Sequence, residues 1–423
     1  MKFETHTLKN GLRVVLVPVA GAESVTVMVM SGTGSRYESE RENGLAHFLE
    51  HMLFKGTKRR PTAKAIAEEL DGVGGVYNAF TSKDHTAYYA KVDKRHFTTA
   101  FDVVSDIFLN ATLPPREITR ERGAILEEIN MYEDMPMRGI LDEFDMCLFG
   151  SNDPLGRTIL GPKENIKHFT RREFMEYLTR NYVAGNSAIS VTGAFSKSEV
   201  LAHIKKVFAG MRAGAAPAHA RYTHEQSAPR VHIKYKETDQ THFVLGLPSY
   251  PHHHKDEAVV EVLSAILGGG MSSRLFSEVR ERRGLAYYVK AENDQYDDTG
   301  NFIMRAGVSH KNLIKALKTT LAEVRKLKKA NVSKKELTKV KEHVKGSMAL
   351  ALDTTDALAQ YTGYGLLVRH KLETVEDLSR AIEKVTAAEI RRVVRDLFKT
   401  ERLNLAVVGP HKNKKALTAL LKV

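Results

Sequence analysis

The sequence has almost no cysteine, no tryptophan and no long apolar run. Its 423 residues include a single cysteine, Cys147. One thiol excludes a framework of intramolecular disulfides, and it excludes any zinc site built from several cysteines. No apolar run reaches the roughly 18–20 residues that span a bilayer. The N-terminal residues lack both the apolar core of a signal peptide and the Arg- and Ser-rich composition of a transit peptide. These absences predict a cytoplasmic protein with no membrane association.

Acidic residues are also fewer than basic ones. The chain has 64 Lys and Arg against 51 Asp and Glu, so its formal net charge is +13. An excess of this size is one property of proteins that bind nucleic acids. The basic residues are interleaved with Leu, Val and Ala in predicted helices such as 311–345, and no aromatic and basic recognition motif accompanies them. A solvated surface is the better interpretation, and we expect no nucleic-acid partner.

The length and one change in composition predict the domain organisation. A chain of 423 residues with 42% hydrophobic content suggests two or three domains, at roughly 100–200 residues per domain. Residues 209–230 lie at the midpoint, are rich in Ala, Gly and Pro, and show no periodicity. This composition is typical of a linker. We therefore predict one domain over residues 1–208 and a second over residues 231–423.

An internal repeat is the next prediction. Thr170 and Glu173 begin a predicted helix, and Thr386 and Glu389 begin another, each with the Thr-x-x-Glu pattern of a capping box. A predicted strand follows each helix, and the offset between the two copies stays at 216 positions throughout. Any two stretches of helix and strand resemble each other to some degree. The constant offset and the linker at the midpoint nevertheless favour duplication.

The segment 44–54 concentrates the residues that point to chemistry. It reads GLAHFLEHMLF, which as a helix has an apolar arc and an opposite polar arc. His47, Glu50 and His51 share the polar arc. The histidines are four positions apart, so both imidazoles can reach one metal ion. A catalytic zinc needs three protein ligands and an open position for water, and a carboxylate beside that water can act as general base. The alternative is an amphipathic helix with an ordinary polar face.

The predicted repeat tests this segment, because the same offset aligns residues 47–51 with residues 263–267. Those residues are Leu-Ser-Ala-Ile-Leu. The second copy therefore keeps a helical segment but lacks the polar triplet. This difference favours a metal site that is confined to the first half of the chain.

A third ligand is expected in the charged segment 120–130. Glu121 and Glu128 are seven positions apart, two turns along one face of a predicted helix. Glu128 could bind the metal while Glu121 supports a histidine from behind. Glu127 points about 100° away from Glu128 and is expected to face solvent. The alternative for all three is a charged helix face.

Together, H-F-L-E-H and the downstream E-R-G-A-I-L-E-E-I resemble the inverzincins of the pitrilysin family, whose zinc motif reverses the order of H-E-x-x-H. The third ligand in that family is a glutamate well downstream, with another glutamate seven residues before it, and Glu128 and Glu121 match these positions. The resemblance covers nearly the whole chain. Its length is similar to that of the short, dimer-forming members, such as the subunits of the mitochondrial processing peptidase.

The resemblance implies an α+β fold of two homologous domains, each a mostly antiparallel sheet with helices packed on one face. It implies that Asn78 and Ala79 lie on an edge strand that pairs with a peptide substrate. In the second half, Arg280 and Tyr287 match the family's Arg…Tyr substrate-binding element. By this likeness Arg280 would hold substrate carbonyls, and Tyr287 would donate to the oxyanion of the tetrahedral intermediate.

The expected function is that of a zinc-dependent endopeptidase with one Zn²⁺ per chain. The resemblance implies His47, His51 and Glu128 as ligands and Glu50 as general base. In long family members the Arg…Tyr element lies in a fourth domain, facing the zinc of the first. A two-domain chain has no fourth domain, so we expect a homodimer in which the partner's second domain completes each active site. The alternative within the family is a non-catalytic partner or scaffold subunit. Such subunits typically lose the zinc triplet, which this chain keeps.

The physiological substrate does not follow from the sequence. A cationic peptide would favour an acidic chamber, and seven acidic residues near the predicted site could supply negative charge. Linear order does not show whether they line one cavity: Glu38, Glu40, Glu42, Glu121, Glu127, Glu133 and Asp134.

Overall fold

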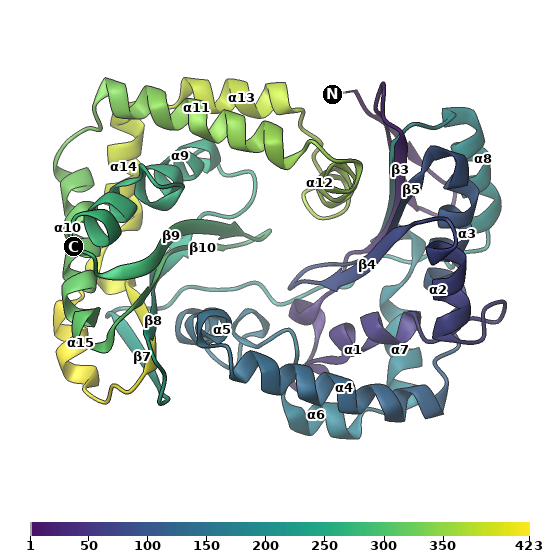
Figure 1. The fold of residues 1–423 in the computed structure, drawn as a ribbon, viewed down its shortest axis with the longest axis horizontal. Helices are drawn as coiled ribbons and strands as arrows, with labels where there is room; N and C mark the ends of the chain where they lie inside the picture. Colours follow the sequence, from purple (N-terminus) through teal and green to yellow (C-terminus); the bar gives the residue numbers. More distant parts are fainter. Residues whose placement is uncertain (1) are drawn as a thin grey trace. The chain divides into compact units, whose positions relative to one another are not determined.

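Two β-sheets organise the chain, and each forms the centre of one unit (Figure 1). The structure is a computed structural model that describes residues 2–423. The first unit consists of residues 2–130, 158–220 and 349–374, and the second of residues 131–157, 221–348 and 375–423. The boundary between residues 220 and 221 falls inside the predicted linker, 209–230.

The sheet of the first unit has six strands in the order β1-β2-β6-β3-β5-β4. Strands β2 and β6 are parallel, and every other pair is antiparallel. Strand β4 lies at one edge and pairs with β5. The strand bounds are β1 (Glu4–Thr7), β2 (Arg13–Pro18), β3 (Ser24–Ser31), β4 (Val76–Thr81), β5 (Thr86–Asp93) and β6 (Ser187–Gly193). The helices of this part of the chain are α1 (Leu45–Leu53), α2 (Ala63–Asp71), α3 (Phe97–Asn110), α4 (Pro115–Glu133), α6 (Lys163–His168), α7 (Arg171–Asn181) and α8 (Lys197–Phe208).

The sheet of the second unit has five strands in the order β7-β11-β8-β10-β9, again with one parallel pair, β7 and β11. The strand bounds are β7 (Arg230–Tyr235), β8 (Thr241–Ser249), β9 (Ala286–Gln295), β10 (Gly300–Val308) and β11 (Asn404–Gly409). The helices are α9 (Glu257–Gly268), α10 (Leu313–Lys329), α11 (Lys334–Ala351), α13 (Val375–Lys384), α14 (Ala387–Leu397) and α15 (Lys414–Leu420).

The two sheets repeat one topology, which confirms the predicted α+β fold of two homologous domains. Strands β2-β6-β3-β5-β4 of the first sheet correspond in order and direction to β7-β11-β8-β10-β9 of the second. Helices α7 and α14 cover residues 171–181 and 387–397, so the offset of 216 holds at both ends. Each of these helices begins with a complete capping box, at Thr170 with Glu173 and at Thr386 with Glu389.

The predicted continuous domains need one correction, because the two halves exchange a helix. Helix α5 (Pro136–Phe149) belongs to the first half but contacts β8 and β11 in the second unit, whereas α12 (Thr355–Leu367) from the second half contacts β3 and β6 in the first. In the first unit, α3 contacts β3 and β5 from the face opposite α12 (Figure 1). Each sheet therefore carries helices of its own half on one face and one exchanged helix on the other, so helices cover both faces of each sheet rather than the one face that the sequence predicted.

Apolar packing explains why the exchanged helices belong to these sheets. Ile140, Phe144 and Leu148 of α5 are buried against Val244 and Ile303 of the second sheet. Burying such a side chain fully contributes about 1.5–3 kcal/mol. Glycine makes the close approach possible, because a Cβ at residue 246 would lie 2.6 Å from the Phe144 ring.

The first sheet receives α12 in the same way. Ala359 and Leu367 are buried against Met28 and Met30 of β3, and a Cβ at Gly363 would overlap the Met30 sulfur. A polar contact adds to this apolar packing between α12 and β3, since Thr355 Oγ1 accepts a 2.9 Å hydrogen bond from Thr26. Helix α12 is therefore part of the first unit, although it follows the linker in sequence.

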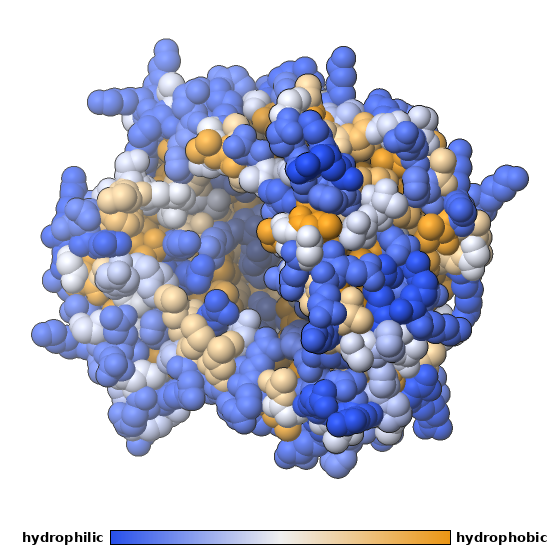
Figure 2. All heavy atoms as spheres, turned by 45° about the vertical axis from the view of Figure 1, so that its right-hand side comes forward, coloured by the Kyte–Doolittle hydropathy of each residue, from blue (hydrophilic) through white to orange (hydrophobic). Residues whose placement is uncertain are grey.

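The surface is polar where Figure 2 shows it, with hydrophilic side chains over most of the visible face. Within residues 2–423, no helix is both long enough and apolar enough to cross a membrane.

Candidate metal centre

Helix α1 presents the polar triplet, and the structure explains why it begins where it does. Its N-cap is Gly44, which has a φ of 100°, a conformation that favours glycine. The buried Glu38 carboxylate accepts hydrogen bonds from the backbone N–H groups of Gly44 (2.9 Å) and Ala46 (2.6 Å) and from the Asn43 side chain (3.1 Å). Burial raises the pKa of Glu38 to about 7, although these donors oppose the shift. Glu38 thus supports the start of the helix and is not a side chain of an open chamber.

The other face of α1 is fixed by apolar packing. Leu45, Phe48, Leu49, Met52 and Leu53 are all buried, as the predicted apolar arc requires. The Phe48 ring packs edge-to-face on Phe174 at 4.9 Å. A helix held by its whole apolar face has little freedom to rotate, so the polar face points in one direction.

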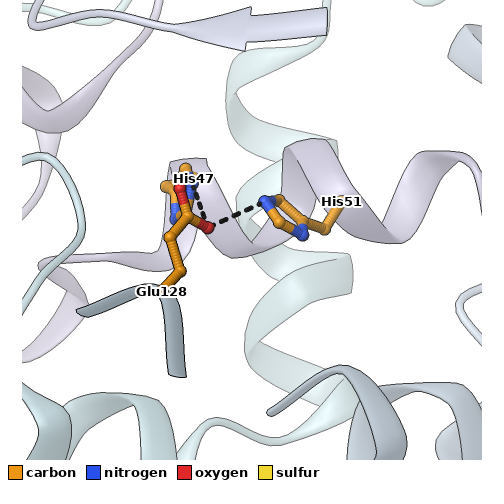
Figure 3. A group of neighbouring side chains, drawn as sticks. All are labelled: His47, His51 and Glu128. Atoms are coloured by element: carbon orange, nitrogen blue, oxygen red, sulfur yellow. Dashed lines mark ion pairs between the residues drawn. The ribbon is translucent and has the colours of Figure 1, made fainter. Parts of the chain in front are cut away.

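The structure brings His47, His51 and Glu128 together, with α4 supplying the carboxylate (Figure 3). Each histidine places its Nε2 atom 3.6 Å from Glu128 Oε2. All three potential ligand atoms lie within 4.8 Å of one another. In a tetrahedral zinc site, ligands at 2.0–2.2 Å from the ion are roughly 3.3–3.5 Å apart. Two nitrogens and one oxygen at these separations fit a zinc ion after small side-chain adjustments.

Glu121 lies behind His51, in the supporting position that the sequence predicted. Its Oε1 atom is 2.9 Å from His51 Nδ1, and Lys55 Nζ lies 2.5 Å from its Oε2 atom. Burial alone would raise the pKa of Glu121, but its hydrogen bonds with His51 and Lys55 outweigh burial and lower it. An ionised Glu121 accepts a hydrogen bond from the Nδ1–H group of His51, which leaves the Nε2 lone pair free to bind a metal.

His47 is almost fully buried, and its environment keeps the imidazole neutral. Burial, helped by the nearby His51, lowers the pKa of His47 to about 3. For His51, burial lowers the pKa, but the hydrogen bond to Glu121 and the surrounding carboxylates outweigh burial and raise it. A neutral His47 offers a lone pair to a cation at neutral pH, which is the form that a metal ligand requires.

Glu50 lies beside the triplet and contacts the edge strand. Thr81 Oγ1 donates a 2.6 Å hydrogen bond to Glu50 Oε2. Burial raises the pKa of Glu50 and outweighs the effect of this hydrogen bond, which lowers it. A carboxylate with a raised pKa is a stronger proton acceptor, as a general base must be.

Asn78 and Ala79 lie on β4, at the edge of the first sheet, where the family resemblance places them. Asn78 is exposed and Ala79 is buried. The Ala79 N–H donates to the Asn78 side-chain oxygen at 2.9 Å. In the described chain β4 pairs with β5 alone, so its other edge remains open for an added strand.

Arg280 and Tyr287 lie in the second unit, whereas the metal-binding triplet lies in the first. The Arg280 guanidinium stacks over the Phe276 ring at 4.8 Å and over the Tyr287 ring at 5.4 Å. Tyr287 is 74% exposed. The two side chains therefore form one element, in which Tyr287 is exposed and Arg280 is half-buried. The action of this pair on a substrate stays a prediction.

Comparison with known proteins finds two family models that match successive parts of the chain. Residues 13–163 match the family described as insulinase (peptidase family M16). Residues 168–344 match the peptidase M16 inactive domain. A zinc protease of Bacillus subtilis, YmxG, is 36% identical over 96% of this chain and 98% of its own length, and its name calls it uncharacterized. The chain belongs to peptidase family M16. The resemblance to the pitrilysin family is thereby confirmed.

Further M16 relatives have the same extent. A zinc protease of Streptomyces coelicolor, also named as uncharacterized, is 35% identical over 97% of this chain and 90% of its own length. The crystal structure of a protease from Helicobacter pylori superposes with a TM-score of 0.89 at 26% identity, covering 97% of this chain and 99% of the other. An M16 inactive-domain structure from Pseudomonas fluorescens, at 21% identity and the same TM-score, shows the shared fold. The chain thus covers 90–99% of the length of these relatives.

The inactive-domain match begins in the first repeat, at residue 168, and extends to residue 344 in the second. Residues 263–267 lie in α9 and are buried, so the helix that corresponds to α1 packs into the core on the face where α1 carries its polar triplet. Glu127 is exposed and hydrogen-bonds to Asn130, as expected for the carboxylate that points away from the site.

Sequence analysis missed the contributions of Lys55 and Thr81, and it assigned Glu38 to a possible acidic chamber rather than to the start of α1. Lys55 lies four positions after His51, so helical spacing could have placed it next to Glu121. Thr81 ends the predicted edge strand, but its contact with Glu50 depends on how α1 lies against β4. Glu38 carried no local signal, because its partners are backbone N–H groups.

Proposed function

We propose that this protein is a zinc-dependent endopeptidase that hydrolyses peptide bonds in extended or unfolded peptides. The observation that carries the proposal is the meeting of His47, His51 and Glu128 with Glu50 beside them. These three residues would hold one zinc ion per chain. When bound, zinc polarises the scissile carbonyl and lowers the pKa of the attacking water. The names of the relatives support zinc and proteolysis as the coarser assignment.

Glu50 would perform the proton transfers. Its carboxylate removes a proton from the attacking water and then delivers that proton to the nitrogen of the leaving amine. Burial raises the pKa of Glu50, which favours both steps, because the same group must accept a proton and release it. Glu121 would keep His51 oriented throughout, through the hydrogen bond to Nδ1.

Strand β4 would bind the substrate. An extended peptide can add to its open edge, with backbone hydrogen bonds supplying most of the affinity. Asn78 and Ala79 lie midway along this strand, on the element that also carries Thr81. Backbone recognition of this kind tolerates many side chains, so we expect weak sequence preference and a preference for unfolded substrates.

Arg280 and Tyr287 would complete the site from a partner subunit. In a C2 homodimer, each zinc centre would face the second unit of the other chain, with Arg280 on the substrate carbonyls and Tyr287 donating to the oxyanion. The exposure of Tyr287 supports this role, since its hydroxyl is accessible to a bound substrate.

The decisive experiment combines metal analysis with peptide hydrolysis. We expect about one zinc per chain in the wild type and in Glu50→Gln, because Glu50 is not a ligand in this proposal. Cleavage of an unstructured peptide should occur in the wild type and be lost in Glu50→Gln. Glu127→Gln, which changes an exposed carboxylate on α4, is the matched control and should cleave normally.

Two outcomes would contradict the proposal. A wild type that binds no zinc and stays inactive after zinc is added would remove the enzyme interpretation. A wild type that binds zinc but cleaves no unfolded peptide would favour the alternative of a non-catalytic partner subunit within the family.

A further inference from the structure

A single hydrogen bond joins the edge strand to Glu50. Thr81 is the last residue of β4, and its hydroxyl donates to Glu50 Oε2 at 2.6 Å. The two residues are 31 positions apart in sequence. This contact links the strand proposed to bind the substrate with the residue proposed to move the proton.

The strand meets α1 at two points along one face. Side chains alternate along β4, so Tyr77, Ala79 and Thr81 share a face. The Tyr77 ring lies 6.4 Å from the ring of Phe54, the residue that follows α1. Thr81 meets Glu50 at the other end. Because Ala79 between them is small and buried, the strand lies close along the helix.

The hydrogen bond occupies one oxygen of Glu50 and leaves the other available. Glu50 Oε2 accepts from Thr81, whereas Oε1 has no hydrogen-bond partner among residues 2–423. Glu50 is half-buried and lies on the helix face shared by His47 and His51. A carboxylate held in this way presents one defined lone pair toward the space beside the histidines.

We propose that Thr81 is a positioning residue that orients Glu50 and couples its orientation to the substrate strand. The inference rests on the proposed peptidase function. A peptide that adds to β4 straightens and fixes the strand, and the strand then fixes the Thr81 hydroxyl and through it the carboxylate. Proton transfer is sensitive to the position of the carboxylate, since a displacement of about 1 Å can lower the rate roughly 100-fold.

A merely structural role for Thr81 makes a different prediction. Threonine favours strands because it is β-branched, and valine favours them equally well. Thr81→Val therefore keeps the shape and the strand propensity but removes the donor. Thr81→Ser keeps the donor and removes the methyl group. If Thr81 only supports the strand, the valine variant should behave as the wild type and the serine variant should be worse.

The test measures kcat and KM for an unstructured peptide, together with peptide affinity. We expect Thr81→Val to lower kcat by about 10- to 100-fold with KM changed by less than about twofold, and Thr81→Ser to restore most of the rate.

Affinity and metal content provide readouts that do not depend on turnover. Fluorescence anisotropy with a labelled peptide should give the same Kd for Glu50→Gln with and without Thr81→Val, and zinc content should stay the same. Tyr77→Phe removes the other hydroxyl on the same strand face, which bonds Asp71 rather than Glu50, and is the matched control with unchanged kcat.

The proposal is overturned if Thr81→Val keeps wild-type kcat, or if Thr81→Ser is as slow as Thr81→Val. It is also overturned if Thr81→Val changes the peptide Kd in the Glu50→Gln background. A failure of the peptidase function itself is distinguishable, because the wild type would then show no cleavage at all.

Discussion

At the scale of single residues, the geometry of the candidate centre depends on the residues that hydrogen-bond to its metal-facing side chains. Glu121 is held from two sides, by His51 Nδ1 at 2.9 Å and by Lys55 Nζ at 2.5 Å. The lysine charge keeps the carboxylate ionised, and the ionised carboxylate fixes the tautomer of the histidine. Groups in this position commonly change metal affinity 10- to 100-fold when they are replaced.

We therefore predict that Lys55→Met weakens zinc binding by about tenfold, because Glu121 loses its cation and holds His51 less firmly. Lys55→Arg should recover much of the affinity, since the charge is kept. Competition with a chromophoric chelator measures the zinc Kd. Lys58→Met removes an exposed lysine nearby and serves as control. Equal zinc affinity in wild type and Lys55→Met would disprove the role of Lys55.

Single residues also differ in whether sequence patterns could predict their place in the candidate site. His47, Glu50 and His51 were predictable, because helical spacing alone places them on one face. Glu128 and Glu121 were predictable as a pair through their seven-residue spacing and the family resemblance. The roles of Thr81 and Glu38 were not predictable, because each residue contacts α1 from another segment of the chain. Residue spacing along a single helix or strand does not indicate such a contact.

At the scale of elements, the exchange of α5 and α12 is the main departure from the predicted domains. Each helix lies in the half of the chain that does not contain the sheet it covers. Both contacts depend on a glycine, at Gly246 beneath Phe144 and at Gly363 against Met30. A β-strand and a helix can approach this closely only where no side chain separates them.

We predict that Gly363→Val destabilises the protein by about 1–3 kcal/mol, because the new side chain must displace Met30 or lift α12 from β3. The midpoint of thermal unfolding measures the effect. Gly346→Ala is the matched control, since it lies in helix α11 and a Cβ there meets nothing within 4 Å. That variant should be neutral or more stable, because alanine favours helices. An unfolding midpoint for Gly363→Val equal to that of the control would show that α12 does not need this close approach.

Periodicity could not have predicted the exchange. Helix α12 has an apolar face, and so does α5, but neither pattern states which sheet receives it. The repeat itself was predictable, since the offset of 216 residues holds for helices α7 and α14, for their capping boxes and for the C-terminal ends of strands β6 and β11. Local sequence therefore determined the helices and strands. Which sheet each exchanged helix covers depended on the fit between their surfaces and on the close contacts at Gly246 and Gly363.

At the scale of the whole molecule, the open question is whether one chain contains a complete active site. The candidate metal centre belongs to the first unit and the Arg280–Tyr287 element to the second. The homodimer proposed above assigns these two parts of each site to different chains. This arrangement requires that inactive variants of the two parts complement each other.

We predict that mixing Glu50→Gln chains with chains that carry both Arg280→Ala and Tyr287→Ala restores activity. After random subunit exchange about half of the dimers are mixed and each holds one intact site, so about a quarter of wild-type activity should return. Differently tagged chains confirm the exchange. If exchange is complete and no activity returns, each site is built from a single chain or the Arg280–Tyr287 element plays no part.

The sequence by itself determined the family, the duplication and the helix that carries His47, Glu50 and His51, because these depend on residue spacing along single elements. Only the tertiary structure decided that Glu38 supports that helix, that Thr81 meets Glu50 and that α5 and α12 change sheets. The physical reason is the same in each case. Residue spacing along a helix or strand indicates which side chains share a face. Contacts between distant segments depend instead on which surfaces fit closely enough to exclude water.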